Sequence, residues 1–278
     1  MQTEMKNEMK IGFIGGGNMA SALIGGLAGR LTASERIHVV DVNAAALQKL
    51  EQQFGVGTAP QIGAALAACE VIVLAVKPQQ MKAVAAELRP HLGSQLVLSI
   101  AAGIRAADLS RWLGGHDAIV RCMPNTPALI GQGIAGMVAT AGVSGEQRAA
   151  ADAVMRAVGA TVWLDDESLI DAVTAVSGSG PAYVFYFLEA MQQAALELGL
   201  SQEQGTALAI ATFGGAAQLA AQSSEPLSVL RERVTSKGGT THAALTSMAA
   251  SDVKGGIIAA VKAAAARSRE LGEEFGRD

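Results

Sequence analysis

Three glycine-rich segments are the places in this chain where backbone amides could bind an anion. Residues 15–17, 177–181 and 235–241 each precede a segment with helical periodicity. The start of a helix carries unpaired N–H groups and the positive end of the helix dipole, and glycine lets a ligand approach the backbone closely. The segments therefore predict sites for phosphate or carboxylate groups. Ordinary capped helix starts are the alternative for the second and third.

The first segment fits a dinucleotide-binding motif. Gly15, Gly17 and Ala20 occupy the three positions of G-x-G-x-x-G/A, between an apolar run that predicts a strand and a segment that predicts a helix. In that setting the first glycine allows a tight turn, the second lets the backbone approach a pyrophosphate, and the alanine allows close packing of helix on sheet. A merely flexible turn is the alternative, and the context favours a dinucleotide site.

Asp41 ends the next predicted strand, roughly 20 residues beyond the motif. An acid there accepts hydrogen bonds from ribose hydroxyls and disfavours a 2′-phosphate, which favours NADH. Asn43 lies nearby, and Arg36 precedes the same strand, so NADPH stays open. The alternative role for Asp41 is that of a helix N-cap.

The ends of two further predicted strands extend this site. Ligands of open α/β sheets bind beyond the carboxyl ends of the strands, and small residues there leave room for ribose and nicotinamide. We expect main-chain contacts at these ends, and a solvated side chain is the alternative for Lys77. The predicted cofactor-binding residues are Ile14, Gly15, Gly16, Gly17, Asn18, Met19, Asp41, Asn43, Ala75, Val76, Lys77, Pro78, Ala101, Ala102 and Gly103.

Residues 121–127, Arg-Cys-Met-Pro-Asn-Thr-Pro, follow a later predicted strand in the same way. Two prolines restrict this loop. It is either a rigid loop beside the nicotinamide or a turn that connects two domains.

The chain lacks the usual catalytic side-chain motifs. None of the four histidines stands in a motif with a serine or cysteine nucleophile, and no HxxE or HExxH spacing predicts a metal site. Cys69 and Cys122 form no CxxC pair and no zinc-binding pattern. Hydroxyls and backbone amides do little acid–base chemistry alone, so a cofactor must carry the reaction.

The elements that position these residues fall into two parts. From residue 10 to about 164, β-branched runs alternate with helical segments; the strands are expected at 11–14, 37–40, 71–76, 96–99, 118–122, 136–140 and 161–164. Helices are expected between them at 44–54, 79–88 and 146–158. This alternation predicts an α/β fold with a doubly wound, parallel Rossmann-type sheet.

After residue 166 the periodicity is helical only. The segments are 182–198, 204–222, 227–234, 241–250 and 253–275. We therefore expect an NAD(P)-binding domain at 1–166 and an all-α domain at 167–278. Because helices that are apolar all round must be buried, a subunit interface is expected in the second part.

Composition excludes several other classes of protein. The net charge is −4, half of the 278 residues are hydrophobic, and no Lys/Arg run exceeds two. A nucleic-acid partner is therefore not expected, because duplex binding needs clustered basic residues. The uncharged segments are interrupted by glycine and polar residues, so neither a signal peptide nor a membrane span is expected. A cytoplasmic protein without a disulfide framework fits these features.

The assembled motifs resemble the pyrroline-5-carboxylate reductase family. The matching blocks, in family order, are residues 15–19, 75–78, 101–103, 123–127, 171–174, 177–182 and 234–241. The resemblance implies reduction of 1-pyrroline-5-carboxylate, an imine carboxylate, to proline, the last step of proline biosynthesis. It implies NADPH as the cofactor, with NADH as the alternative, and a helical dimerisation domain whose homodimers assemble into a decamer.

The resemblance also assigns substrate-site residues. It places the substrate carboxylate at Ser236, Gly239, Thr240 and Thr241, held mainly by main-chain amides. Glu167 matches an acidic substrate-site position, and Arg233 matches a position that contacts substrate through its backbone. Thr241 matches the threonine whose hydroxyl reaches the ring nitrogen, and it is the expected catalytic residue.

The chain departs from common family patterns at a few positions. Lys237 replaces a proline near the expected carboxylate site, and Ile62 replaces an asparagine near the adenine. Two other functions stay open. A related β-hydroxyacid-dehydrogenase-like reductase would carry a catalytic lysine in the helical domain, and a non-catalytic NAD(P) sensor would lose its substrate loop.

Overall fold

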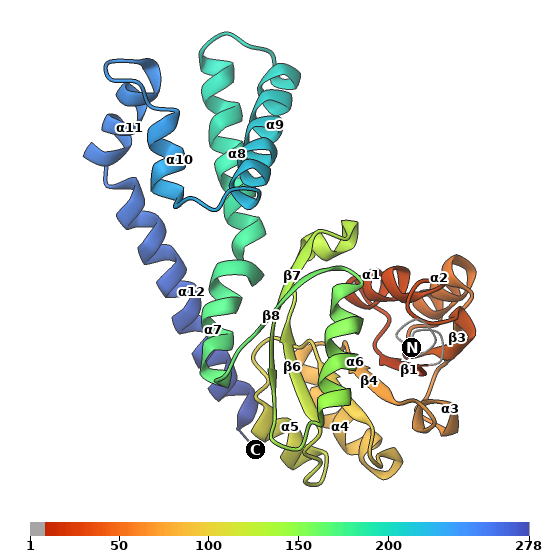
Figure 1. Cartoon of the computed structure of the whole chain (residues 1–278). Helices are drawn as coiled ribbons and strands as arrows, with labels where there is room; N and C mark the ends of the chain where they lie inside the picture. The colour runs from red at the N-terminus through yellow and green to blue at the C-terminus, as the bar shows by residue number, and fades with distance from the viewer. Residues whose placement is uncertain (1–8, 278) are drawn as a thin grey trace. The chain divides into compact units, whose positions relative to one another are not determined.

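The structure is a computed structural model that describes residues 9–277. Within this part of the chain eight strands form one sheet, in the order β3-β2-β1-β4-β5-β6-β7-β8 (Figure 1). The strands are β1 (Ile11–Ile14), β2 (Ile37–Val40), β3 (Gly57–Ala59), β4 (Val71–Leu74), β5 (Leu96–Ser99), β6 (Ile119–Met123), β7 (Gly133–Ala139) and β8 (Gly159–Trp163). The predicted doubly wound α/β fold is confirmed.

Two features of the sheet differ from the prediction. β7 pairs with β6 antiparallel, whereas all other neighbours are parallel. The connection from β6 to β7 holds only the short 3₁₀ helix η5 (Thr126–Ile130), and a parallel pair needs a crossover of roughly a dozen residues or more. β3 was not predicted because its three residues, Gly-Thr-Ala, carry no apolar run.

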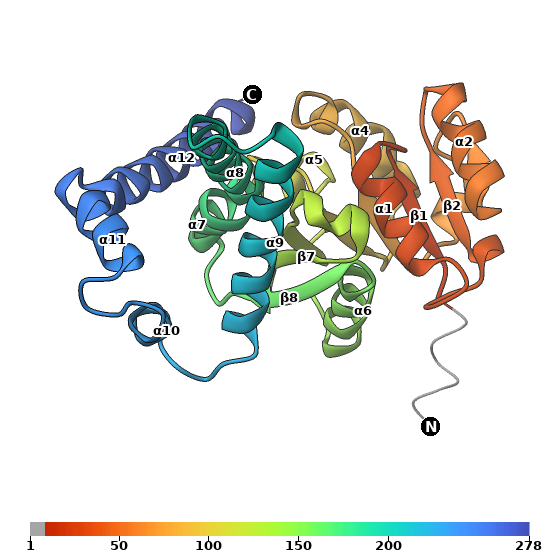
Figure 2. The same cartoon turned by 90° about the horizontal axis from the view of Figure 1, so that it is seen from above.

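Helices cover both faces of the sheet. α1 (Asn18–Leu27), α2 (Ala44–Phe54) and α6 (Gly145–Arg156) share one core cluster with Phe13 of β1. α3 (Ala64–Ala67), α4 (Met81–Leu88) and α5 (Ala106–Trp112) share the other with Ile72 of β4. Figure 2 shows α1 and α2 beside β1 and β2. Strands buried on both faces are apolar without alternation, and β1, β4 and β5 are buried at every residue.

The chain after β8 is helical, as predicted. A 3₁₀ turn η6 (Glu167–Leu169), α7 (Ile170–Val173) and a π-helical turn η7 (Thr174–Gly178) lead into the longer helices. These are α8 (Gly180–Glu197), α9 (Gln202–Ala221), α10 (Leu227–Arg233), α11 (Thr240–Ala250) and α12 (Val253–Gly276). α8 and α9 pack side by side, with the rings of Phe187 and Phe213 6.3 Å apart.

The contacts divide the chain into two compact units. One contains residues up to Ser179 together with those from Ala264 onward, and the other is Gly180–Ala263. The division after residue 166 that the sequence suggests stays a prediction.

The Gly180–Ala263 unit exposes large apolar side chains. Phe185, Tyr186 and Leu219 are 59%, 72% and 61% exposed. Exposed apolar surface on this scale is typical of an interaction face. Among residues 9–277 no single helix is long and apolar enough to span a membrane. The bent pair α11 and α12 reaches that length and hydropathy only when the two helices are taken together.

Candidate active site

The loop after β1 has a backbone that requires glycine. Gly15 has φ +102°, and a Cβ there would lie 2.6 Å from the carbonyl oxygen of Ala75. The Gly15 N–H donates to the Val40 carbonyl at 2.8 Å. Gly17, the N-cap of α1, has no atom within 4 Å of its Cβ position, and no side chain caps this helix. The start of α1 is therefore open to an anion, which fits a pyrophosphate.

The carboxylate of Asp41 is held by two backbone amides. Its Oδ2 accepts from Gly16 N at 2.6 Å, and its Oδ1 accepts from Asn43 N at 2.8 Å. The side chain of Asn43 caps α2 by accepting from the N–H groups of Ala45 and Ala46. The alternative role of Asp41 as the helix cap is therefore wrong, since Asn43 fills it and leaves the acid facing the glycine loop.

A cavity of about 500 Å³ lies beyond the carboxyl ends of β1, β2 and β4. The predicted cofactor residues that line it are Ile14, Gly15, Gly17, Asp41, Ala75, Val76 and Lys77. Ile62, Gln80 and Glu87, which were not predicted as cofactor residues, line it as well. Arg36 ends the turn before β2, at the opposite end of that strand from Asp41. The cavity and its open amides fit a dinucleotide.

A smaller cavity, of about 280 Å³, lies next to the first. Met19, Ala75 and Val76 line it, and so do Ile100, Met123, Pro124, Asn125, Thr126 and Gly178. The loop 121–127 thus reaches a cavity that shares two residues with the larger one, and Asn125 Oδ1 fixes it by accepting from Ile134 N at 2.9 Å. The fixed Asn125 and the shared cavity residues favour a rigid loop beside the nicotinamide over a turn that only connects two domains.

The remaining predicted cofactor residues lie at the edges of this region. Asn18 begins α1, and Pro78 begins a 3₁₀ helix, η3 (Pro78–Gln80). Ala101 and Gly103 are buried after β5, and a Cβ on Gly103 would lie 3.0 Å from the ring of Phe275. Residues 101–103 line neither cavity.

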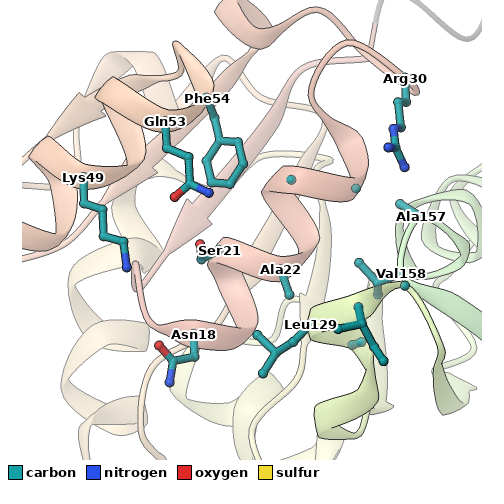
Figure 3. A pocket seen from close by; sticks show the side chains of 15 residues that line it. Asn18, Ser21, Ala22, Arg30, Lys49, Gln53, Phe54, Leu129, Ala157 and Val158 are labelled. Carbon is teal, nitrogen blue, oxygen red and sulfur yellow. The ribbon is translucent and has the colours of Figure 1, made fainter.

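A third cavity, of about 520 Å³, lies on the side of α1 turned away from the sheet, between α1, α2 and η5 (Figure 3). Two glycines of α1 allow its neighbours to approach. A Cβ on Gly25 would lie 3.1 Å from the ring of Phe54, and one on Gly26 would lie 2.4 Å from the carbonyl oxygen of Ala157. These glycines serve packing, and Asn18 is the predicted cofactor residue that lines this cavity.

The segment 177–181 forms no open helix start. Ser177 and Gly178 lie inside η7, and Ser179 N donates to the Thr174 carbonyl at 2.8 Å, so the helical backbone continues from α7 into α8. The Ser177 hydroxyl donates to the carbonyl of Val173 at 3.0 Å. The interpretation of this segment as an anion site is wrong, because its amides are used within the helix.

The segment 235–241 does form an open helix start. Gly238 has φ +74°, and Gly239 N donates to the Ser236 carbonyl at 3.0 Å, which closes a tight turn. Gly239 is the N-cap of α11 without a side-chain cap, and Thr240 and Thr241 form the first turn. The structure therefore gathers Ser236, Gly239, Thr240 and Thr241 at one helix N-terminus.

Arg233, the last residue of α10, has an acidic partner that the sequence did not single out. Its Nη2 lies 2.5 Å from Glu225 Oε1. The other oxygen, Oε2, is buried and has no hydrogen-bond partner among the described residues. The two residues are eight positions apart and belong to no short motif.

Glu167 lies in the other unit, beside a buried arginine. Its Oε1 accepts from Arg121 Nη1 at 2.8 Å and from Ala106 N at 2.7 Å. No short motif joins Arg121 to Glu167, and the signal in the sequence is a charged residue inside an otherwise apolar strand.

The cysteines carry no reactive thiolate. Burial raises the pKa of Cys69 to about 11 and also raises the pKa of Cys122. A thiol nucleophile requires a lowered pKa, so neither residue fits that role. No group of three or more His, Cys, Asp or Glu side chains placed to hold a metal occurs within residues 9–277.

Comparison with known proteins identifies both parts of the chain. A family described as NADP oxidoreductase, coenzyme F420-dependent, matches residues 10–103, and one described as pyrroline-5-carboxylate reductase dimerisation matches residues 167–271. Together with the cavities, these matches define an NAD(P)H-dependent oxidoreductase. A pyrroline-5-carboxylate reductase of Pseudomonas aeruginosa is 47% identical over 96% of this chain and 98% of its own. The chain belongs to the pyrroline-5-carboxylate reductase family.

Solved structures agree with this membership. A pyrroline-5-carboxylate reductase from Coxiella burnetii superposes with a TM-score of 0.90 at 38% identity, over 95% of this chain and 99% of its own. The Plasmodium falciparum pyrroline carboxylate reductase, with NADP bound, gives a TM-score of 0.85 at 30% identity over 96% and 99%.

Proposed function

We propose that the chain reduces 1-pyrroline-5-carboxylate to L-proline with NAD(P)H, as the last step of proline biosynthesis. The observation that carries this proposal is the N-terminus of α11, which no side chain caps, in a chain that also has a cavity at the glycine loop after β1. The thiols of Cys69 and Cys122 are buried and protonated, so the proposal assigns the chemistry to the coenzyme and not to a cysteine nucleophile.

In this proposal the amides of Thr240 and Thr241, with Ser236, hold the substrate carboxylate, and Gly239, whose own N–H donates to the Ser236 carbonyl, forms the turn that opens the helix start. Converging N–H groups and the helix dipole favour an anion there by about 0.3 to 2 kcal/mol from the dipole. Arg233 contributes through its backbone. Glu167 is not placed among the groups that hold the carboxylate, because two negative charges repel; its Oε1 accepts from Arg121 and from Ala106 N.

Thr241 orients the imine nitrogen through its hydroxyl and relays a proton to it. Bound NAD(P)H supplies the hydride that the imine carbon accepts. An iminium ion accepts hydride readily, so alignment by the protein contributes more than acid catalysis.

The proposed cofactor residues are the predicted set given above, with the glycine loop at the pyrophosphate and Asp41 at the ribose. Lys77, at the end of β4, contributes its main chain. Loop 121–127 is placed beside the nicotinamide.

We also propose that the chain self-associates through residues 167–278 and that its homodimers assemble into a decamer. In this proposal the protein works in the cytoplasm and binds neither a membrane nor a nucleic acid. Residues 1–166 would form the NAD(P)-binding domain. The exposed apolar side chains of α8 and α9 support self-association, and the net charge of −4 supports the absence of a nucleic-acid partner.

The test is an assay of the purified chain with 1-pyrroline-5-carboxylate and with NADPH or NADH in parallel. Proline formation with either coenzyme is expected. Turnover only of another imine or keto acid would favour the related reductase, and nucleotide binding without any turnover would favour the sensor.

A further inference from the structure

Arg121 carries a charge in the interior of the sheet. Its side chain is 6% exposed and lies on β6 among apolar neighbours. A buried guanidinium is costly unless an opposite charge and hydrogen bonds compensate it. Glu167 supplies that charge at 2.8 Å, and the Nε of Arg121 has no partner among the described residues. The fold therefore depends on Glu167 at this place.

Glu167 ties three segments together with one oxygen. Oε1 accepts from Arg121 on β6 and from Ala106 N at the start of α5, while Glu167 itself begins η6. The segment that leaves η6 is thereby fixed against β6.

Two of these three segments, β6 and the run that begins at η6, lead to the 280 Å³ cavity. Arg121 precedes Met123 by two residues on β6, and the run from Glu167 through α7 and η7 ends at Gly178. Met123 and Gly178 form touching walls of the cavity: a Cβ on Gly178 would lie 2.6 Å from Met123 Cε. A shift of η6 relative to β6 would change the spacing of these walls.

We propose that Arg121 and Glu167 are positioning residues for the reduction, and that Glu167 acts through Arg121 without touching the substrate. The pair keeps Met123 and Gly178 at the spacing that the nicotinamide end of the coenzyme requires. This inference rests on the proposed function.

The test compares Glu167→Gln, Arg121→Met and the double variant in steady-state kinetics. Each single variant is expected to lower kcat by about 10- to 100-fold, since small misplacements of reacting groups cost this much. The KM for 1-pyrroline-5-carboxylate should stay within about threefold, because ligands of the substrate are untouched. The double variant should be no slower than the slower single variant, because both changes remove one interaction.

Two further measurements separate positioning from simple stability. The melting temperature should fall most in Glu167→Gln, which leaves the buried charge of Arg121 unpaired, and less in Arg121→Met, which leaves the half-exposed Glu167. It should recover from the Glu167→Gln value in the double variant while kcat stays low. The fluorescence of bound NADH, which reports on the environment of the reduced ring, should change in all three. Arg121→Lys keeps the cation and serves if Arg121→Met does not fold.

The matched control is Glu273→Gln, which breaks the exposed Arg105–Glu273 pair at 4.0 Å and should change neither kcat nor the melting temperature. A large rise in KM in Glu167→Gln alone, with Arg121→Met unaffected, would show that Glu167 touches the substrate and would overturn the inference. A kcat equal to that of the wild type in all three variants would also overturn the inference. A wild-type chain without turnover would instead overturn the proposed function, and with it this role.

Discussion

Replacing Asp41 by asparagine should shift coenzyme selectivity toward NADPH. The carboxylate is fixed in the cavity by Gly16 N at 2.6 Å and Asn43 N at 2.8 Å, so it cannot turn away without losing both bonds. The titratable side chains that line the cavity are one base, Lys77, and two acids, Asp41 and Glu87. A 2′-phosphate would therefore meet a fixed negative charge.

The size of the shift follows from two contributions. A pair of like unit charges about 4 Å apart costs about 1 kcal/mol in water and about 4 kcal/mol at an effective dielectric constant of 20. Removing the charge also weakens the charge-assisted hydrogen bonds from the ribose of NADH by roughly 1 kcal/mol. The two contributions add to about 2 to 5 kcal/mol, so the ratio of kcat/KM for NADPH over kcat/KM for NADH should rise by roughly 30- to 5000-fold.

Initial rates with each coenzyme, at saturating 1-pyrroline-5-carboxylate, measure this ratio. Glu51→Gln is the matched control: it removes one negative charge from exposed α2 but lies outside the cavity, and it should leave the ratio unchanged. A ratio that stays constant in Asp41→Asn, or that moves toward NADH, would refute the placement of the ribose at Asp41.

Three further predictions concern the loops and the sheet. Thr241→Ala should lower turnover severely while the nucleotide Kd, measured by fluorescence titration, is retained; unchanged kinetics would remove Thr241 from the mechanism. Gly15→Ala should lose coenzyme affinity and stability, because φ is +102° and the new Cβ would lie 2.6 Å from a carbonyl oxygen. Gly17→Ala has open space at its Cβ position and should unfold at the same denaturant midpoint as the wild type. Equal midpoints for the two variants would contradict this prediction. Burial lowers the pKa of His38 from 6.5 in the folded chain, so as the pH falls the unfolded chain binds a proton at His38 before the folded chain does. The free energy of unfolding should therefore keep the whole contribution of His38 at about pH 7.5 and decrease as the pH drops below 6.5. His38→Gln should flatten this dependence in urea unfolding curves, and an unchanged slope would exclude His38 as its source.

The parts of the fold that the sequence predicts well are those set by local pattern. β1, β2 and β5 begin and end where the apolar runs do, because both faces of each strand are covered. α2 is bounded by a side-chain cap at Asn43 and a left-handed Gly55, signals that lie within the helix's own neighbourhood. The glycine loop at residues 15–17 was predicted because its signals also lie close together in the sequence.

The parts that local pattern does not predict depend on pairing across the chain. The antiparallel β6–β7 pair depends on how short the connection is, and a strand's direction leaves no mark in its own residues. Arg121 and Glu167 are 46 positions apart, and only the fold shows that one neutralises the other. The segment 177–181 has the composition of an open helix start, but the π-helical turn uses its amides.

The central claim is tested most directly by the stoichiometry of the reaction. With 1-pyrroline-5-carboxylate and NADPH or NADH, the purified chain should form one proline for each reduced coenzyme oxidised, and the rate should fall sharply in Thr241→Ala. Coenzyme oxidation without proline, or no oxidation with either coenzyme, would contradict the account.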